Sequence, residues 1–157
     1  MILVSSCLAG KACRYDATSC LHAKIGQLAE ENNAVMVCPE VMGGLHTPRD
    51  PAEIVGGTGA DVLTGKAKVI TVNGVDVTEQ FLRGAQQTLK IAKQHNATLI
   101  ILKQNSPSCG SKAIYDGSFT GAKIAGEGVT AALLRQNGFT VISEDDEESG
   151  SVPFNTV

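Results

Sequence analysis

Four short apolar segments are the clearest local feature of the chain. They cover residues 2–6, 34–39, 98–104 and 140–143, and each is centred on consecutive apolar positions. A strand with one solvated face alternates apolar and polar residues, whereas a strand buried on both faces does not. We therefore expect these four segments to form strands in the interior of a sheet.

Three helices are predicted between these strands. The longest covers residues 78–94, where apolar residues recur at intervals of three and four. Residues 22–32 and 129–136 show similar spacing over fewer turns. Apolar strands that alternate with helices are typical of a parallel sheet covered on both faces. The predicted fold is therefore α/β, a three-layer parallel sheet of the Rossmann-like or flavodoxin-like kind.

Two further segments depart from this alternation. Residues 69–77 alternate in polarity around Asn73 and Gly74, which predicts a small β-hairpin appended to the sheet. Residues 144–157 begin with an acidic cluster and contain few apolar residues, so we expect a solvated and partly mobile tail. Because no repeat or linker divides the chain, we expect residues 1–157 to form a single domain.

The composition narrows the classes of partner. The 157 residues are 43% hydrophobic and 18% charged with a net charge of −3, so electrostatics give no reason to bind nucleic acid or an anionic membrane. No apolar run approaches the length of a membrane-spanning helix, and the first residues do not have the pattern of a secretory signal. We therefore expect a cytoplasmic protein, where thiols serve as ligands or catalytic groups more often than as disulfides.

Three of the five cysteines follow predicted strands. Cys7 comes after the first strand, Cys38 ends the second and Cys109 lies a few residues beyond the third. The carboxyl ends of parallel strands meet at one edge of a sheet, which is also where open α/β sheets bind ligands. We therefore expect these three thiols to converge at a site, while Cys13, in the loop after Cys7, is an alternative or additional ligand.

The spacing of the cysteines bears on what they hold. A structural zinc site usually has four ligands, often in closely spaced pairs, and such a pair is missing here. Thiolate groups are also typical of iron–sulfur clusters. A cluster with three protein thiolates leaves one iron without a protein ligand, and that iron is able to act as a Lewis acid. The remaining interpretation is that the cysteines are small buried hydrophobic residues.

Polar residues beside these thiols offer acid–base chemistry. Glu40 lies two residues beyond Cys38, and Ser106 and Ser108 flank Cys109 in a loop that contains proline and glycine. A carboxyl group whose pKa is moved by its surroundings is suited to general acid or base catalysis, and the serines are potential donors. The competing interpretations are a surface ion pair from Glu40 to a neighbouring arginine, and turn capping by the serines.

Six motifs in this order resemble a bacterial family of thiouracil desulfidases that was long known as a domain of unknown function. They are SCLAG at 6–10, CRYD at 13–16, CPE at 38–40, GGL at 43–45, PR at 48–49 and SPSCG at 106–110. The resemblance covers nearly the whole chain. Each motif alone is weak, but the ordered combination is specific.

The resemblance implies the cofactor, the site and the partners. The cofactor would be a [4Fe–4S] cluster on Cys7, Cys38 and Cys109, with one open iron. Glu40 would be the acid–base residue, and Ser106 or Ser108 an assisting donor. The reaction would be the non-redox removal of sulfur from a small thiolated heterocycle such as thiouracil, giving uracil and hydrosulfide. Iron–sulfur assembly machinery is an implied partner.

Two other functions stay open at this point. The same cluster suits a sulfur relay or the dehydration of a small substrate. A zinc-stabilised binding module is a third hypothesis, although the cysteine spacing and the polar residues in the same loops argue against it. The sequence leaves the oligomeric state and the exact form of the substrate open.

Overall fold

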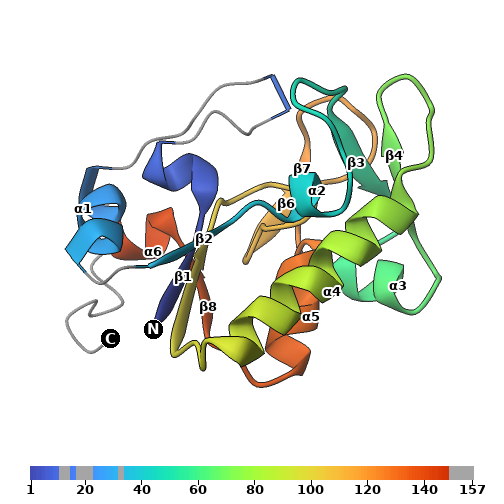
Figure 1. Cartoon of the computed structure of the whole chain (residues 1–157). Coiled ribbons are helices and arrows are strands. Elements are labelled where there is room, and N and C mark those ends of the chain that lie inside the picture. The colour runs from blue at the N-terminus through green and yellow to red at the C-terminus, as the bar shows by residue number, and fades with distance from the viewer. Residues whose placement is uncertain (11–14, 17–22, 32–33, 149–157) are drawn as a thin grey trace.

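A computed structural model describes residues 1–10, 15–16, 23–31 and 34–148, and a four-stranded sheet forms its centre (Figure 1). All neighbouring strands are parallel, and their spatial order is β2, β1, β5, β8. This is the order of the first four strands of a flavodoxin-like sheet. The strands are β1 (Ile2–Ser5), β2 (Val35–Val37), β5 (Leu99–Leu102) and β8 (Val141–Ser143). The predicted α/β class and parallel sheet are confirmed.

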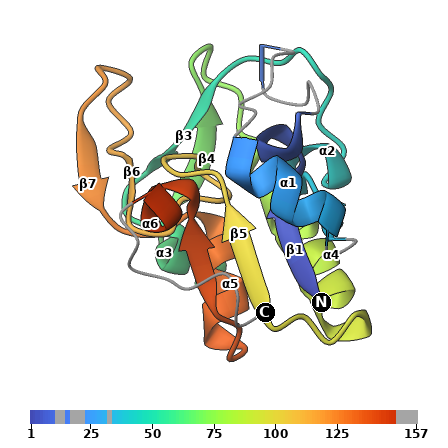
Figure 2. The same ribbon diagram turned by 90° about the vertical axis from the view of Figure 1, so that its left-hand side faces the viewer.

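Helices cover both faces of this sheet because successive strand residues point to opposite sides. Leu3 and Ile100 are buried against α4 (Thr78–Gln94) and α5 (Val129–Gln136). Ile2 and Ile101 are buried on the other face, in a cluster with residues of α1 (Ala23–Glu31). Figures 1 and 2 show α1 and α6 on one side of the sheet, and α4 and α5 on the other. The helix predicted over residues 78–94 therefore has the expected bounds and one buried face.

A second apolar core lies beside the main sheet, around two small antiparallel sheets. In one of them β3 (Ala52–Val55) pairs with β4 (Lys68–Thr71), and in the other β6 (Ala113–Tyr115) pairs with β7 (Lys123–Ala125). The core between them includes Phe81 of α4 and residues of α3 (Gly59–Leu63).

The hairpin predicted over residues 69–77 is correct in part. The turn at Asn73 and Gly74 is present, with Gly74 at φ +84°. The chain after that turn forms a single bridge, between Ile70 and Asp76, while the main partner of β4 is β3. The prediction missed β3 because the pairing depends on contacts across the second core, whereas the turn is a local feature. The β6–β7 hairpin was not predicted either.

Two short helices follow the first two strands directly. The 3₁₀-helix η1 (Ser6–Ala9) comes after β1, and α2 (Pro39–Met42) begins one residue after β2. Helices α2 and α4 approach closely at Gly84, where an added Cβ would lie 1.9 Å from the carbonyl oxygen of Pro39. Glycine is required at that contact, and the contact fixes where the chain after β2 lies.

The acidic segment that begins at residue 144 is not a solvated tail over its first residues. It forms α6 (Glu144–Glu148), in which Glu144 is 8% and Asp146 5% exposed. Glu144 accepts a hydrogen bond from the backbone N–H of Gln104 at 2.8 Å and pairs with Lys103 at 2.9 Å. Asp146 pairs with Lys112. These partners lie at the end of β5 and in the loop beyond it, so the expectation was wrong here because the charges are paired inside the fold.

The rest of the predicted tail, residues 149–157, lies outside the described residues. Among the helices of the described part, none has the length and apolarity needed to cross a membrane.

Candidate active site

The three thiols at the strand ends line one cavity. Cys7 lies in η1 after β1, Cys38 is the N-cap residue of α2 after β2, and Cys109 follows β5. All three contribute to the wall of a cavity of about 480 Å³. In the sheet β1 lies between β2 and β5, so this is the edge where the strand order reverses and where α/β sheets bind ligands. The structure thus brings together the three thiols expected to converge.

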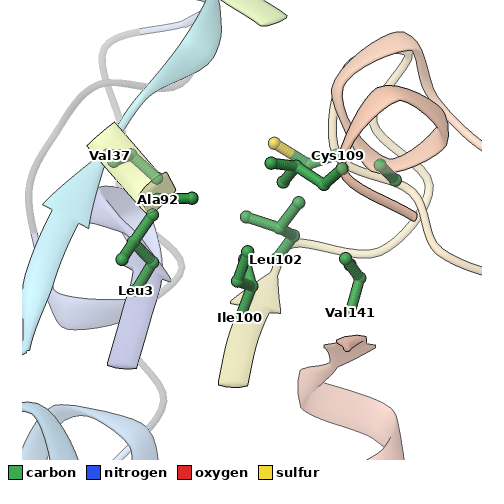
Figure 3. Packing of buried hydrophobic residues seen from close by; sticks show 9 residues of the cluster. Leu3, Val37, Ala92, Ile100, Leu102, Cys109 and Val141 are labelled. Carbon is green, nitrogen blue, oxygen red and sulfur yellow. The ribbon is translucent and has the colours of Figure 1, made fainter. Parts of the chain in front are cut away.

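The three thiols differ in exposure. Cys7 and Cys109 are buried and Cys38 is half-buried, and none of the three forms a disulfide. Figure 3 shows Cys109 next to Leu102, at the end of the apolar cluster on the α4 side of the sheet. Burial raises the pKa of the Cys109 thiol to about 12, while a hydrogen bond from Ser108 opposes this and the nearby Glu40 adds to it. A thiolate at this position therefore needs a strongly positive partner, such as a metal ion, which deprotonates its thiol ligands.

The three thiols of the cavity are the candidate ligands of a metal group at this site. Within the part of the chain that the structure describes, no three Cys, His, Asp and Glu side chains are grouped closely enough to hold one ion. In a cluster each thiolate binds a different iron, so its ligands lie farther apart than those of one ion.

Glu40 is placed at this cavity by the first turn of α2. Its carboxylate lies 3.6 Å from Nε of Arg49, and the two side chains are 19% and 9% exposed. Burial raises the pKa of Glu40, and the Arg49 charge together with hydrogen bonds from the serines offsets this only in part. The ion pair weighed from sequence as a surface feature is thus present, but it lies in the cavity wall. A carboxyl group with a raised pKa is suited to proton transfer near neutral pH.

The two serines have different positions. Ser106 lines the cavity, whereas Ser108 is 1% exposed and lies behind it. Their hydroxyl oxygens are 2.9 Å apart, and the Ser108 hydroxyl donates to Glu40 at 3.4 Å. Ser106 Oγ also accepts hydrogen bonds from the backbone N–H groups of Ser108 and Cys109, at 3.1 and 3.2 Å. The serines therefore connect the cavity to Glu40 and also hold the loop that carries Cys109.

Gln104 is a site residue that the sequence did not reveal. Its side-chain oxygen accepts hydrogen bonds from the backbone N–H groups of four residues of the following loop, at 3.2 to 3.4 Å. The donors are Asn105, Ser111, Lys112 and Ala113. Gln104 is 7% exposed and fixes the loop that contains Cys109. A glutamine after a strand has no distinctive local signal, because the role depends on how the loop wraps around it.

The side of the cavity contributed by the small sheets was also missed. Glu53 of β3, Tyr115 of β6 and Phe119 of the β6–β7 loop all line the cavity. The sequence offered one indication that Tyr115 and Phe119 belong to a site, which is that aromatic residues are scarce. The chain has two tyrosines, four phenylalanines and no tryptophan. Both tyrosines contribute to this one cavity.

One candidate ligand cannot be placed. Cys13 lies outside the described residues, as does Cys20. The alternative of Cys13 as a ligand therefore stays a prediction from the sequence.

Comparisons with known proteins place the chain in a family. The 2-thiouracil desulfurase family matches residues 2–146. A solved structure named "[4Fe-4S]-dependent thiouracil desulfidase TudS" is 42% identical, covers 99% of this chain and 98% of its own, and superposes with a TM-score of 0.84. The uncharacterized protein YbbK of Bacillus subtilis (strain 168) is 59% identical over 146 residues, which are 93% of this chain and 97% of YbbK. The chain belongs to the 2-thiouracil desulfurase family.

Proposed function

We propose that this protein is an iron–sulfur-dependent desulfidase that removes the sulfur atom from a small thiolated pyrimidine such as thiouracil. In the proposed reaction the carbon–sulfur bond of the substrate is replaced by a carbon–oxygen bond. Water supplies the oxygen and the protons, and the sulfur leaves as hydrosulfide. No electrons are gained or lost, so the reaction needs no oxidant or reductant.

The proposed cofactor ligands are Cys7, Cys38 and Cys109. The support for this set is that the three thiols come from the ends of three adjacent parallel strands and line one cavity. When bound by three thiolates, a [4Fe–4S] cluster supplies an iron without a protein ligand, which acts as a Lewis acid toward a sulfur or oxygen donor. A protein of this kind receives its cluster from iron–sulfur assembly machinery, and thiols that form no disulfide suit the reducing cytoplasm.

Glu40 is the proposed acid–base residue. Its carboxylate shares the cavity wall with Cys38 and Cys109 and is connected through Ser108 to Ser106, which faces the cavity. In the ionised form Glu40 takes a proton from the attacking water. Arg49 holds the carboxylate from the other side at 3.6 Å and keeps it oriented. The serine hydroxyls give the proton a path of two hydrogen bonds between the carboxylate and the cavity.

The single observation that carries this proposal is the juxtaposition of three thiols and a half-buried carboxyl group in one cavity. The test is to purify the protein without oxygen, measure iron and acid-labile sulfide, and follow hydrosulfide release from 2-thiouracil and 4-thiouracil. We expect a brown protein that contains iron and sulfide and releases hydrosulfide stoichiometrically with uracil. A colourless protein with bound zinc, or a cluster protein inert toward both thiouracils, would refute the proposal.

The Glu40→Gln variant tests the acid–base assignment. Glutamine keeps the size of the side chain and a hydrogen-bond acceptor for Ser108 but cannot take up a proton, so turnover should fall about 10²–10⁴-fold. Iron content and the visible absorption spectrum should stay unchanged, because Glu40 is not a proposed ligand. Wild-type turnover in this variant would show that Glu40 does not transfer a proton.

A further inference from the structure

The side of the cavity formed by the small sheets carries aromatic rings. Tyr115 and Phe119 line the same cavity as the three thiols, and both are half-buried. The Lys123 ammonium group lies 5.6 Å from the centre of the Tyr115 ring, within the range of a cation–π contact. The thiols, Glu40 and Ser106 come from the loops of the main sheet, so the cavity has one chemically reactive wall and one aromatic wall. Below, "aromatic wall" means Tyr115 and Phe119.

Phe119 has a backbone conformation that needs support. Its φ is +58°, a left-handed value that bulky residues rarely adopt because of the Cβ. Two residues earlier, Gly117 has φ +92°, and an added Cβ there would lie 2.6 Å from the carbonyl oxygen of Ile54. The loop is therefore pressed against strand β3, and its shape depends on contacts with that strand.

Glu53 of β3 supplies the contacts that hold this shape. Its Oε1 accepts hydrogen bonds from the backbone N–H groups of Gly117, at 2.9 Å, and Phe119, at 3.2 Å. One carboxylate oxygen thus bridges both ends of the strained turn. Hydrogen bonds to a charged acceptor are stronger than neutral ones, which suits a device that maintains an unfavourable conformation. Glu53 also lines the cavity, so it lies beside the aromatic wall that it supports.

We propose that the aromatic wall of Tyr115 and Phe119 binds the flat ring of the substrate by stacking, and that Glu53 is a positioning residue that holds Phe119 in place. This inference rests on the proposed function and names the part of the site that selects a planar heterocycle. Aromatic side chains stack on nucleobases of any identity because every base has a π-face. The wall therefore accounts for affinity toward the ring, while the opposite wall carries the reaction.

The first test compares three variants at two positions in the loop. Phe119→Leu keeps an apolar side chain but removes the ring face, so KM for thiouracil should rise roughly tenfold while kcat stays within about threefold of wild type. Phe119→Tyr keeps the ring face and should have a KM near that of wild type. Ala122→Ser, at an exposed position of the same loop that does not line the cavity, is the matched control and should have no effect.

The second test separates positioning by Glu53 from direct contact with the substrate. Glu53→Ala removes the acceptor and should raise KM about as much as Phe119→Leu. Glu53→Gln keeps one side-chain oxygen that can accept both N–H groups, so it should restore KM to within about threefold of wild type. If Glu53→Gln is impaired as severely as Glu53→Ala, a side-chain oxygen that accepts the two N–H groups is not sufficient at this position, and the positioning role as stated is refuted.

Binding of the product gives a readout that does not depend on turnover. Calorimetric titration of the anaerobically prepared holoprotein with uracil should show weaker binding for Phe119→Leu and Glu53→Ala, with unchanged iron content. If the wild-type protein turns over thiouracil but these variants keep wild-type KM and uracil affinity, the aromatic wall is refuted and the proposed function stands. If the wild-type protein neither binds uracil nor turns over thiouracil, both proposals fail together.

Discussion

Replacing Gly84 by alanine should lower turnover, because Gly84 of α4 packs against Pro39, which lies between two proposed site residues. Gly84 lies in α4, and an added Cβ would lie 1.9 Å from the carbonyl oxygen of Pro39 and 2.8 Å from its carbonyl carbon. Ordinary contact begins near 3.4 Å, so α2 must shift by about 1.5 Å, the difference between 3.4 and 1.9. Pro39 stands between Cys38 and Glu40, and all three line the cavity. The shift therefore moves a proposed ligand and the acid–base residue together.

The effect on turnover should exceed the effect on stability. Overpacking a core contact costs about 1–3 kcal/mol, while replacing a glycine inside a helix by alanine recovers roughly 1 kcal/mol of helix propensity. We therefore expect the free energy of unfolding to fall by no more than about 2 kcal/mol, which is about 4–8 °C in Tm for a chain of this size. Misplacement of a reacting group by about 1 Å lowers kcat about 10²-fold.

The assay is hydrosulfide release by Gly84→Ala, measured alongside iron content and thermal unfolding. Gly43→Ala is a matched variant, because its Cβ would lie 2.0 Å from the carbonyl oxygen of Gln80 across the same helix contact. Gln87→Ala, on an exposed position of α4, is the control for a change in the helix alone. Folded Gly84→Ala protein with turnover within threefold of wild type would refute the view that this contact positions the site.

Two further predictions concern the serines and the last helix. Ser106→Ala should lower iron content, because Ser106 Oγ accepts the backbone N–H of Cys109, whereas Ser108→Ala should keep iron and lose about 10–100-fold in kcat; equal iron loss in both variants would contradict this. Burial would raise the pKa of Asp146, but hydrogen bonds from Lys112 and a backbone N–H outweigh it and hold the pKa below its usual value. The carboxylate therefore stabilises the fold above the unfolded-state pKa near 4, and this stabilisation disappears as pH falls through the lower folded-state value. Urea unfolding of Asp146→Asn should show a smaller loss of stability between pH 5 and 3 than wild type, and identical pH profiles would contradict the assignment.

The C-terminal acidic segment shows the limits of composition as a guide. A run of acidic residues usually marks a solvated face. Here Glu144 and Asp146 are buried because basic and backbone partners at the end of β5 and in the next loop neutralise them. Those partners are about forty residues away in sequence, at Lys103 and Gln104, or closer, at Lys112, and no local pattern connects them. The burial of a charge is decided by its partner, and the partner is supplied by tertiary structure.

Local sequence patterns were enough to predict the main sheet, its three longer helices and the edge that carries the thiols. The continuous apolar strands and the helical period of residues 78–94 predict which side chains are buried. This is possible because the position of a residue in a helix or strand decides on which face its side chain lies. Because the strands are parallel, the segments that carry Cys7, Cys38 and Cys109 leave the sheet at the same edge.

The way in which that edge becomes a cavity depends on tertiary contacts. The pairing of β3 with β4, the four hydrogen bonds accepted by Gln104 and the support of Phe119 by Glu53 join segments with no common local signal. Such contacts join groups that are distant in the sequence, and their energies depend on distance and orientation in space. Local periodicity indicates which side of a helix or strand is buried. It contains no information on which residue, distant in the sequence, will contact that side.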